Sequence, residues 1–191
     1  MSTIAHRPQR ADARRNRERV LAAARAAFGE TGIDTQVDDI ARRAGVGVGT
    51  VYRHFPTKDA LVQALAEAHF DRLADIVEAG LEIDGDPWTV FTDTIWSTAT
   101  SAAADVAWCE IIAGHPRSVE AAAAGQQRLA AATSELIGRA QAAGAMRADA
   151  TVADIKTIMC GFGHLAASQR AGAPVDWERY LTIALDGLRA R

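Results

Sequence analysis

The sequence has little cysteine and no long hydrophobic run. Only two of its 191 residues are cysteine, Cys109 and Cys160. The two could pair, but without a secretory signal we expect two reduced, buried thiols. No run of about 18 apolar residues is present, which excludes a transmembrane helix. The arginine-rich start has no apolar stretch after its charges, so no secretory signal is expected. These absences predict a cytoplasmic protein with no membrane partner.

Motifs of common enzyme chemistry are missing as well. The sequence contains no GxSxG, no glycine-rich phosphate loop, no HExxH and no CxxC, which are the usual marks of hydrolases, nucleotide-binding enzymes and zinc sites. Asp38 and Asp39 are adjacent and face different ways on a helix, which argues against a catalytic carboxylate pair. We expect no catalytic residue, no metal and no cofactor. The alternative is a small α-helical enzyme with a pocket in its C-terminal part.

The net charge of −3 is unevenly distributed. Residues 1–60 contain eleven Lys or Arg and seven Asp or Glu, a net charge of +4, which leaves −7 for the remainder. A basic N-terminal part on an acidic body predicts that only the first part meets a polyanion. Charge alone is equally consistent with an arginine-rich helix face that is merely solvated.

Alanine, leucine and arginine dominate the composition, there are only five prolines, and no segment alternates like a strand, so we predict an all-α fold of about nine helices. The expected ranges are about 11–29, 36–44, 48–55, 58–80, 88–101, 105–114, 117–143, 150–171 and 177–189. Thr35 is expected to cap the second helix and Pro87 to begin the fifth. Composition and charge both change near Lys58, which predicts two domains, 1–57 and 58–191.

The stretch from Thr35 to Lys58 carries the most specific pattern. It predicts two short helices joined at Gly45, which can adopt the left-handed conformation of a sharp turn. The second of these helices would present Thr50, Tyr52 and Arg53 to base edges and phosphates in the major groove of DNA, which is about 12 Å wide. The residues expected to pack inward are Ile40, Ala41, Ala44, Val51 and Phe55.

This stretch resembles the helix-turn-helix of the tetracycline-repressor (TetR) family of bacterial regulators. The resemblance covers roughly residues 17–65 and rests on Phe28, Thr35, DDIA at 38–41, AGV at 44–46, GTVYRHF at 49–55, Lys58 and Leu61. It implies an all-helical homodimer whose first three helices bind a palindromic double-stranded DNA operator. It also implies a body that binds a small-molecule effector, releasing a repressor when the fourth helix shifts.

Carried over residue by residue, the resemblance assigns DNA contacts to Arg14, Arg15, Arg17, Thr35, Gly47, Val48, Thr50, Tyr52, Arg53, His54 and Lys58. Gly47 departs from the family pattern, because a serine often caps the third helix there and glycine is a poorer cap. Alternatives stay open for three of these assignments. Tyr52 could be partly buried, His54 could only cap the third helix, and the N-terminal arginines could be disordered and add only general attraction to DNA.

The body carries weaker signals. Aromatic residues near hydroxyls and histidines suit a mainly apolar cavity with a few polar groups, and the ligand-contact candidates are His69, Thr92, Trp96, Trp108 and His164. The alternatives are ordinary core packing for the aromatics and a buried, hydrogen-bonded state for the two histidines. The resemblance implies that the last two long helices pair with a second copy. The dimer-interface candidates are Ile155, Met159, Phe162, Leu181 and Leu185, with closure of the chain's own core as the alternative.

Overall fold

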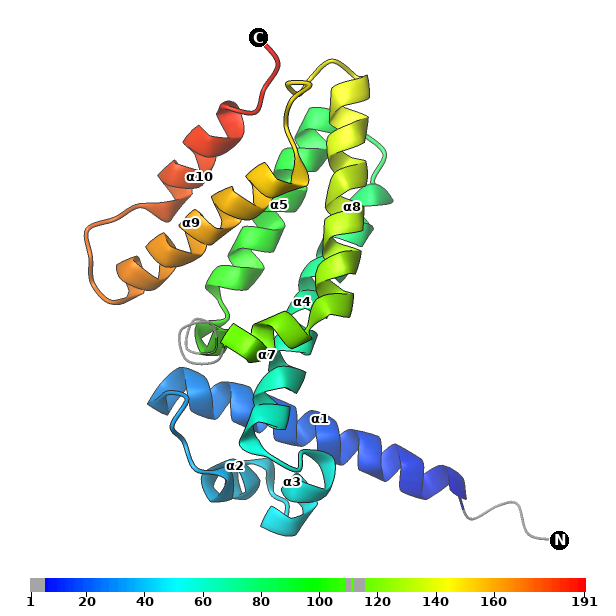
Figure 1. Ribbon diagram of the computed structural model, residues 1–191, viewed down its shortest axis with the longest axis vertical. Coiled ribbons are helices and arrows are strands. Elements are labelled where there is room, and N and C mark those ends of the chain that lie inside the picture. Colours follow the sequence, from blue (N-terminus) through cyan, green and yellow to red (C-terminus); the bar gives the residue numbers. More distant parts are fainter. Residues whose placement is uncertain (1–5, 109–110, 112–115) are drawn as a thin grey trace, which may run out of the picture. The chain divides into compact units, whose positions relative to one another are not determined.

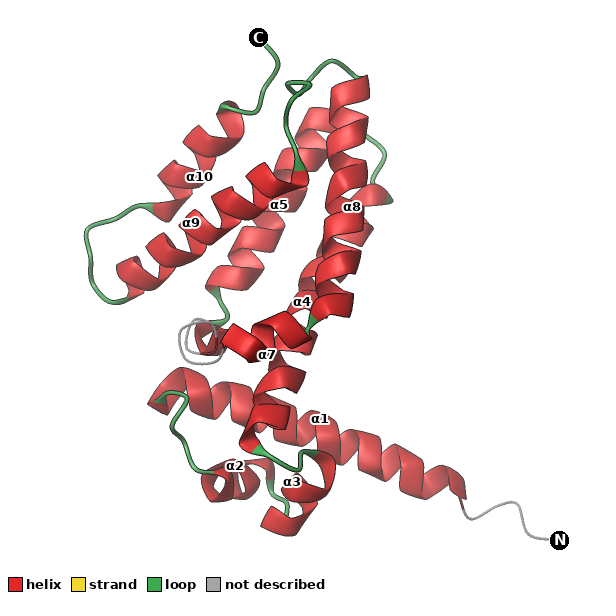
Figure 2. Cartoon of the chain, in the orientation of Figure 1, coloured by secondary structure: helices red, strands yellow, loops and turns green. Residues whose placement is uncertain are grey.

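The computed structural model describes residues 6–108, 111 and 116–191, and within these ranges every regular element is a helix (Figures 1 and 2). The helices are α1 (His6–Thr31), α2 (Val37–Ala44), α3 (Val48–His54), α4 (Lys58–Leu81), α5 (Pro87–Ala103), α7 (Pro116–Ala121), α8 (Ala123–Ala142), α9 (Val152–Arg170) and α10 (Trp177–Asp186). The all-α prediction is confirmed. Of the helix expected at about 105–114, residues 106–108 and 111 are helical, and residues 109–110 and 112–114 lie outside the described residues. In the described ranges, no helix combines the length and hydropathy of a membrane span.

The chain forms two compact units. Unit 1 contains the residues up to Glu67 together with Val106–Ala122, and unit 2 contains Ala68–Asp105 together with Ala123–Arg191. The chain therefore passes between the units three times, inside α4, after Asp105 and after Ala122. These two compact units do not coincide with the domains expected from the sequence, 1–57 and 58–191. That the two domains have separate functions stays a prediction.

The core of unit 1 is built on one side of α1. The apolar stripe of this helix is buried, with Phe28 and Val20 fully covered, and it packs against Ile40 of α2, Val51 of α3 and Leu61 of α4. Burying an aliphatic or phenyl side chain of this size contributes about 1.5–3 kcal/mol. The apolar residues of these four helix segments therefore hold α2 and α3 to α1.

The core of unit 2 joins α5, α8, α9 and α10. Phe91, Leu136, Phe162 and Leu181 are almost completely buried in one cluster. Close packing of α4 on α5 depends on Gly80, where an added Cβ would lie 2.3 Å from Oγ1 of Thr94. Only a residue without a side chain fits this crossing.

Helices α5 and α9 of unit 2 begin at conventional capping residues. Asp86 accepts a hydrogen bond from the backbone N–H of Thr89, and Pro87 occupies the first turn of α5, as predicted. Thr151 and Asp154 form a capping box at the start of α9. Such caps satisfy backbone N–H groups that have no partner inside the helix.

Acid is expected to loosen the first turn of α9. Asp154 accepts hydrogen bonds from the hydroxyl and the backbone N–H of Thr151, at 2.7 and 2.8 Å, and these bonds lower the pKa of Asp154. Because the folded pKa is depressed, the stabilisation is present above the unfolded value, about 3.9 for aspartate, and is lost as pH falls through the folded pKa. Amide exchange of this turn, corrected for intrinsic rates, should accelerate in acid. Asp154→Asn should lack the effect, and an unchanged pH dependence in this variant would contradict the assignment.

Candidate DNA-binding surface

The turn between α2 and α3 has the geometry that the sequence predicts. Gly45 adopts the left-handed conformation, with φ 64° and ψ 39°, and its backbone N–H bonds to carbonyls of the last turn of α2. The N–H of Val46 donates to the carbonyl of Ala41 at 3.0 Å. A Cβ at position 45 would be strained by this φ and would also meet the guanidinium of Arg19 at 2.7 Å. Glycine is therefore required at this bend.

One face of α3 packs inward and the opposite face is open. Val51 and Phe55 are buried against the core of unit 1, as predicted. Tyr52 is 48% exposed and Arg53 is exposed beside it. The exposure of Tyr52 disfavours the alternative of a partly buried turn aromatic. A phenol and a guanidinium on an open helix face can donate hydrogen bonds to phosphates and base edges.

The other predicted contact residues of this helix are less open. Val48, Thr50 and His54 are half-buried, and the His54 ring lies 6.3 Å from the ring of Phe55. Gly47 and Gly49 are exposed, and a Cβ added at either would meet no atom within 4 Å. The first turn of α3 therefore presents backbone, which allows a partner to approach closely.

Helix α1 runs past the helix-turn-helix and carries the basic residues of the N-terminal segment. Arg14, Arg15 and Arg17 are exposed and lie within this helix. Arg14 pairs with Glu18 at 3.6 Å and Arg15 pairs with Asp12. The guanidinium of Arg17 lies 5.3 Å from the ring centroid of Phe55, at the C-terminal end of α3. This contact places Arg17 beside the C-terminal end of α3.

Two residues of this region were not singled out by sequence reasoning. Arg19 donates a hydrogen bond to the carbonyl of Gly45 at 3.3 Å, which ties α1 to the bend. Gln36 holds the N-cap position of α2 without a side-chain capping bond. Nothing in the sequence distinguishes Arg19 from the other arginines, because its role depends on a contact between residues 26 positions apart.

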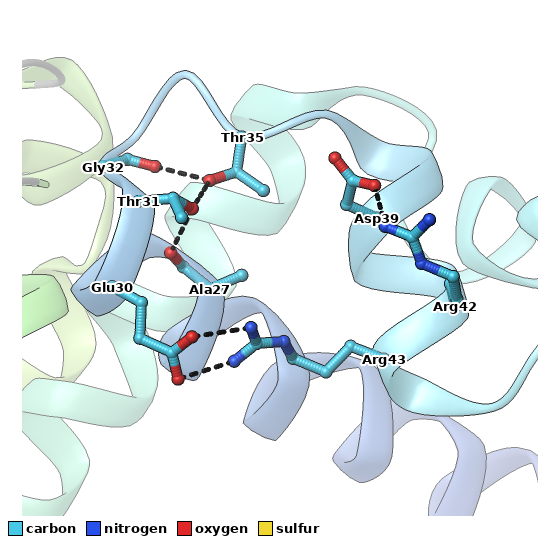
Figure 3. Close-up of polar contacts among 8 residues, drawn as sticks. All are labelled: Ala27, Glu30, Thr31, Gly32, Thr35, Asp39, Arg42 and Arg43. Carbon is cyan, nitrogen blue, oxygen red and sulfur yellow. Dashed lines mark hydrogen bonds and ion pairs between the residues drawn. The ribbon is translucent and has the colours of Figure 1, made fainter.

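The expectation that Thr35 caps α2 is wrong. Its hydroxyl donates to the carbonyl of Gly32 at 2.7 Å and lies 2.6 Å from the hydroxyl of Thr31 (Figure 3). These hydrogen bonds stabilise the connection between α1 and α2. The N-cap residue of α2 is Gln36, one residue after Thr35. The N-cap residues of α2 and α3, Gln36 and Gly47, both lack a side-chain capping bond. Their first backbone N–H groups can therefore bind an anion.

Arginines on the outer face of α2 are neutralised locally. Arg43 donates two hydrogen bonds to Glu30, at 2.7 and 2.8 Å, and Arg42 pairs with Asp39 (Figure 3). The hydrogen bonds and charge of Arg43 lower the pKa of Glu30. Together with Ala27, Thr31 and Thr35, three of these side chains line a half-open cavity of about 400 Å³. Because the positive charges of the two arginines are balanced by the negative charges of Glu30 and Asp39, this side of unit 1 adds no net attraction for a polyanion.

Lys58 begins α4 and is half-buried, with its ammonium 6.0 Å from the ring centroid of Phe28. The ammonium of a lysine in such a position can still reach solvent at the end of its long side chain. A phosphate contact from Lys58 thus remains a prediction.

The ligand-contact candidates do not form one group. His69 is buried and hydrogen-bonded to Asp105, as its alternative reading predicted. Thr92 donates its hydroxyl to carbonyls of its own helix, and Trp96 lies 5.9 Å from Trp177. Trp108 belongs to unit 1 and packs against its core. The fifth candidate, His164, is exposed, which corrects the expectation that it is buried.

Most dimer-interface candidates are used by the chain's own core. Ile155, Phe162, Leu181 and Leu185 are buried in unit 2, and Met159 is half-buried against the same cluster. Their side chains therefore have little surface left for a second copy. The open side of α9 and α10 instead carries Thr157, Cys160, His164 and Ile183, the last 60% exposed.

The expectation of buried thiols is wrong for Cys160, which is exposed on α9. Cys109 lies outside the described residues. The prediction for Cys160 failed because helical spacing identifies a residue's face but does not show whether that face meets solvent.

A glycine bend that supports an exposed Tyr-Arg helix on the core of unit 1 defines a helix-turn-helix DNA-binding protein. Comparison with known proteins specifies the family. Residues 20–65 match the model of bacterial regulatory proteins of the tetR family, and residues 86–190 match the C-terminal domain of SbtR-like transcriptional regulators. The chain belongs to the TetR family of transcriptional regulators.

Solved structures of relatives cover nearly the whole chain. A TetR transcription regulatory protein from Mycobacterium vanbaalenii is 39% identical, with a TM-score of 0.70, over 96% of this chain and 100% of that one. A TetR regulator from Streptomyces coelicolor is 32% identical, with a TM-score of 0.66, over 91% and 98%. The regulator YvdT of Bacillus subtilis is 38% identical over 74 residues, and the match spans 38% of the length of each protein.

Proposed function

We propose that this protein is a cytoplasmic repressor that binds a palindromic operator as a homodimer and is released by a small-molecule effector. The observation that carries the proposal is the open face of α3, with Tyr52 and Arg53 exposed on a helix fixed from behind by Val51 and Phe55. This shape fits the major groove, where base pairs present distinguishable donors and acceptors.

Phosphate contacts would supply much of the affinity. The arginines of α1 and the backbone at the starts of α2 and α3 can contact phosphates on either side of the groove. Because such binding releases counterions, the affinity should fall steeply with salt.

Dimerisation is proposed through the open side of α9 and α10. Ile183 is a large apolar residue at the surface, and Cys160 and Thr157 are small enough for close helix contact. Two copies related by a twofold axis would place two α3 helices in successive major grooves, about 34 Å apart. A palindromic operator follows from this symmetry.

Selection of genomic DNA fragments by the purified protein tests the proposal. Enriched fragments should contain a palindrome, and a footprint should show two protected half-sites on one face of the duplex. A thermal-shift screen of metabolites should find a compound that raises the thermal stability of the protein. The same compound should release the protein from the selected DNA fragment. A protein that enriches no fragment would refute the proposed function, and a footprint on a single half-site would refute the dimeric arrangement.

Gly49→Ala tests whether DNA approaches the backbone of α3. An alanine at position 49 meets no atom of the protein and should stabilise the helix by up to about 1 kcal/mol. We expect it nevertheless to weaken operator binding by about 1–3 kcal/mol, the usual effect of an extra methyl group in a close-packed contact. Fluorescence anisotropy with a labelled fragment measures the affinity.

The matched control is Gly138→Ala in α8, where an added Cβ also meets no atom within 4 Å. It should give a similar gain in stability and leave the operator affinity unchanged. Equal affinities for Gly49→Ala and the unaltered protein would show that the first turn of α3 is not in close contact with DNA.

A further inference from the structure

The half-open cavity between α1 and α2 lies entirely within unit 1 (Figure 3). Its volume of about 400 Å³ falls within the range of small-molecule sites, about 300–1,000 Å³. The two helices and the connection between them supply the lining residues, which are Ala27, Thr31, Thr35, Asp39, Arg42 and Arg43. All of them except the alanine are polar or charged, so the cavity suits a small polar ligand.

The two threonines offer hydrogen-bond acceptors to this cavity. The hydroxyl of Thr31 donates to the carbonyl of Ala27 at 2.8 Å, and the hydroxyl of Thr35 donates to the carbonyl of Gly32 at 2.7 Å. The two hydroxyl oxygens also lie 2.6 Å apart. Because each hydroxyl has one hydrogen and two lone pairs, both hydrogens are used within the protein and lone pairs remain. A ligand at this side of the cavity must therefore bring N–H or O–H donors.

The α2 side of the cavity pairs a guanidinium with a carboxylate. Nη2 of Arg42 donates to Oδ1 of Asp39, and the two side chains are 79% and 50% exposed. An ion pair that is exposed to this degree contributes little to stability, so a ligand can compete for either partner at small cost. Arg43, in contrast, is held by two hydrogen bonds to Glu30. Arg42 and Asp39 are therefore the charged groups that can exchange partners.

The balance of charges determines which class of ligand fits. A simple anion is repelled by the carboxylates of Asp39 and Glu30, and a simple cation is repelled by the two arginines. A zwitterion avoids both penalties, because its carboxylate can accept from Arg42 while its ammonium donates to Asp39. An ammonium has three N–H donors, and the oxygens of Thr31 and Thr35 supply the two further acceptors. Since Arg42 and Asp39 are in direct contact, the charges of the ligand must be adjacent too, as in an α-amino acid.

We propose that this cavity binds a free α-amino acid, with Arg42 holding the carboxylate and with Asp39, Thr31 and Thr35 holding the ammonium. Binding replaces one exposed ion pair with two and leaves the net charge of unit 1 unchanged. The site lies beside the helix-turn-helix, whereas the effector of the proposed function is expected in the C-terminal body. The inference therefore does not depend on the proposed function.

Amide chemical shifts of the ¹⁵N-labelled protein, titrated at constant pH with each of the twenty standard amino acids, test the site without DNA. At least one amino acid should bind with a Kd of about 1 mM or tighter. The amides that shift should belong to residues 27–43, which contain the cavity. The proposal is overturned if no amino acid, tested up to its solubility limit, moves these signals.

Two derivatives of the amino acid that binds distinguish a zwitterion site from a simpler one. Its N-acetyl derivative lacks the ammonium and its methyl ester lacks the carboxylate. Each should bind at least about tenfold more weakly, because each loses hydrogen bonds between charged groups. Full affinity of the N-acetyl derivative would reveal an anion site, and full affinity of the ester a cation site. Either result contradicts the proposal.

Variants test the two charged residues. Asp39→Asn and Arg42→Gln each remove one charge at an exposed position and should each lower the affinity at least about tenfold. The matched controls are Glu135→Gln and Arg139→Gln, which remove the same charges from an exposed ion pair in α8. The controls should bind the amino acid as the unaltered protein does. Unchanged affinity in either cavity variant, or equal losses in the controls, would overturn the assignment of these residues.

Discussion

Arg53→Ala should lower the affinity for the selected operator by about 1–3 kcal/mol, the usual contribution of a bidentate arginine–guanine contact. This corresponds to a loss of about five- to 150-fold. Arg53 is exposed on the side of α3 opposite the buried Val51, so its removal should not disturb the fold. Anisotropy titration of the labelled fragment at fixed salt measures the loss, and a thermal melt verifies that stability is unchanged.

Arg42→Ala is the matched control for this prediction. Arg42 is an exposed arginine in the same unit, but it pairs with Asp39 on the outer face of α2. Its removal should change operator affinity only slightly, within the modest effect of a surface ion pair. Equal losses for Arg42→Ala and Arg53→Ala would mean that general positive charge, and not the face of α3, determines binding.

Phe28→Ala should destabilise unit 1 by about 3–5 kcal/mol, the range found when a buried phenyl ring is removed from a core. Phe28 is fully buried where α1 meets α2, α3 and α4, so the resulting cavity lies directly behind the helix-turn-helix. Operator binding should be lost, because α3 is then no longer held outward. Urea unfolding measures the change in the free energy of unfolding. Amide exchange in peptides from α1–α3 shows whether the destabilisation lies in unit 1.

Phe28→Leu keeps most of the apolar volume and should retain most of the stability and DNA binding. Peptides from α8–α10 should show much smaller changes in either variant, since Phe28 belongs to the core of unit 1 alone. A Phe28→Ala protein that binds the operator with full affinity would contradict the proposed support of α3.

The local features of the fold could be predicted because they depend on neighbouring residues. Gly45 was expected to bend the chain, and it does so with a positive φ. Pro87 was expected to begin a helix, and it lies in the first turn of α5, which Asp86 caps. Thr35 shows the limit of this reasoning, since a threonine at the right spacing found better partners in Gly32 and Thr31 than in α2.

Features that depend on distant packing could not be read from the sequence. Helical spacing places Leu181 and Leu185 on one apolar face, which could pack either in the chain's own core or against a second copy. In the structure both residues are buried in the chain's own core. Trp108 was grouped with Trp96 because both are aromatic residues near hydroxyls and histidines in the part of the chain expected to form the body. A segment of that part belongs to unit 1, and no local pattern indicates the exchange.

Amide hydrogen exchange of the protein, with and without its selected DNA fragment, tests the central claim most directly. We expect DNA to slow exchange in peptides covering α2 and α3, residues 37–54, with the largest change in α3. Slowing confined to α8–α10, or no slowing at saturating DNA, would contradict the assignment of the open Tyr-Arg face as the surface that binds DNA.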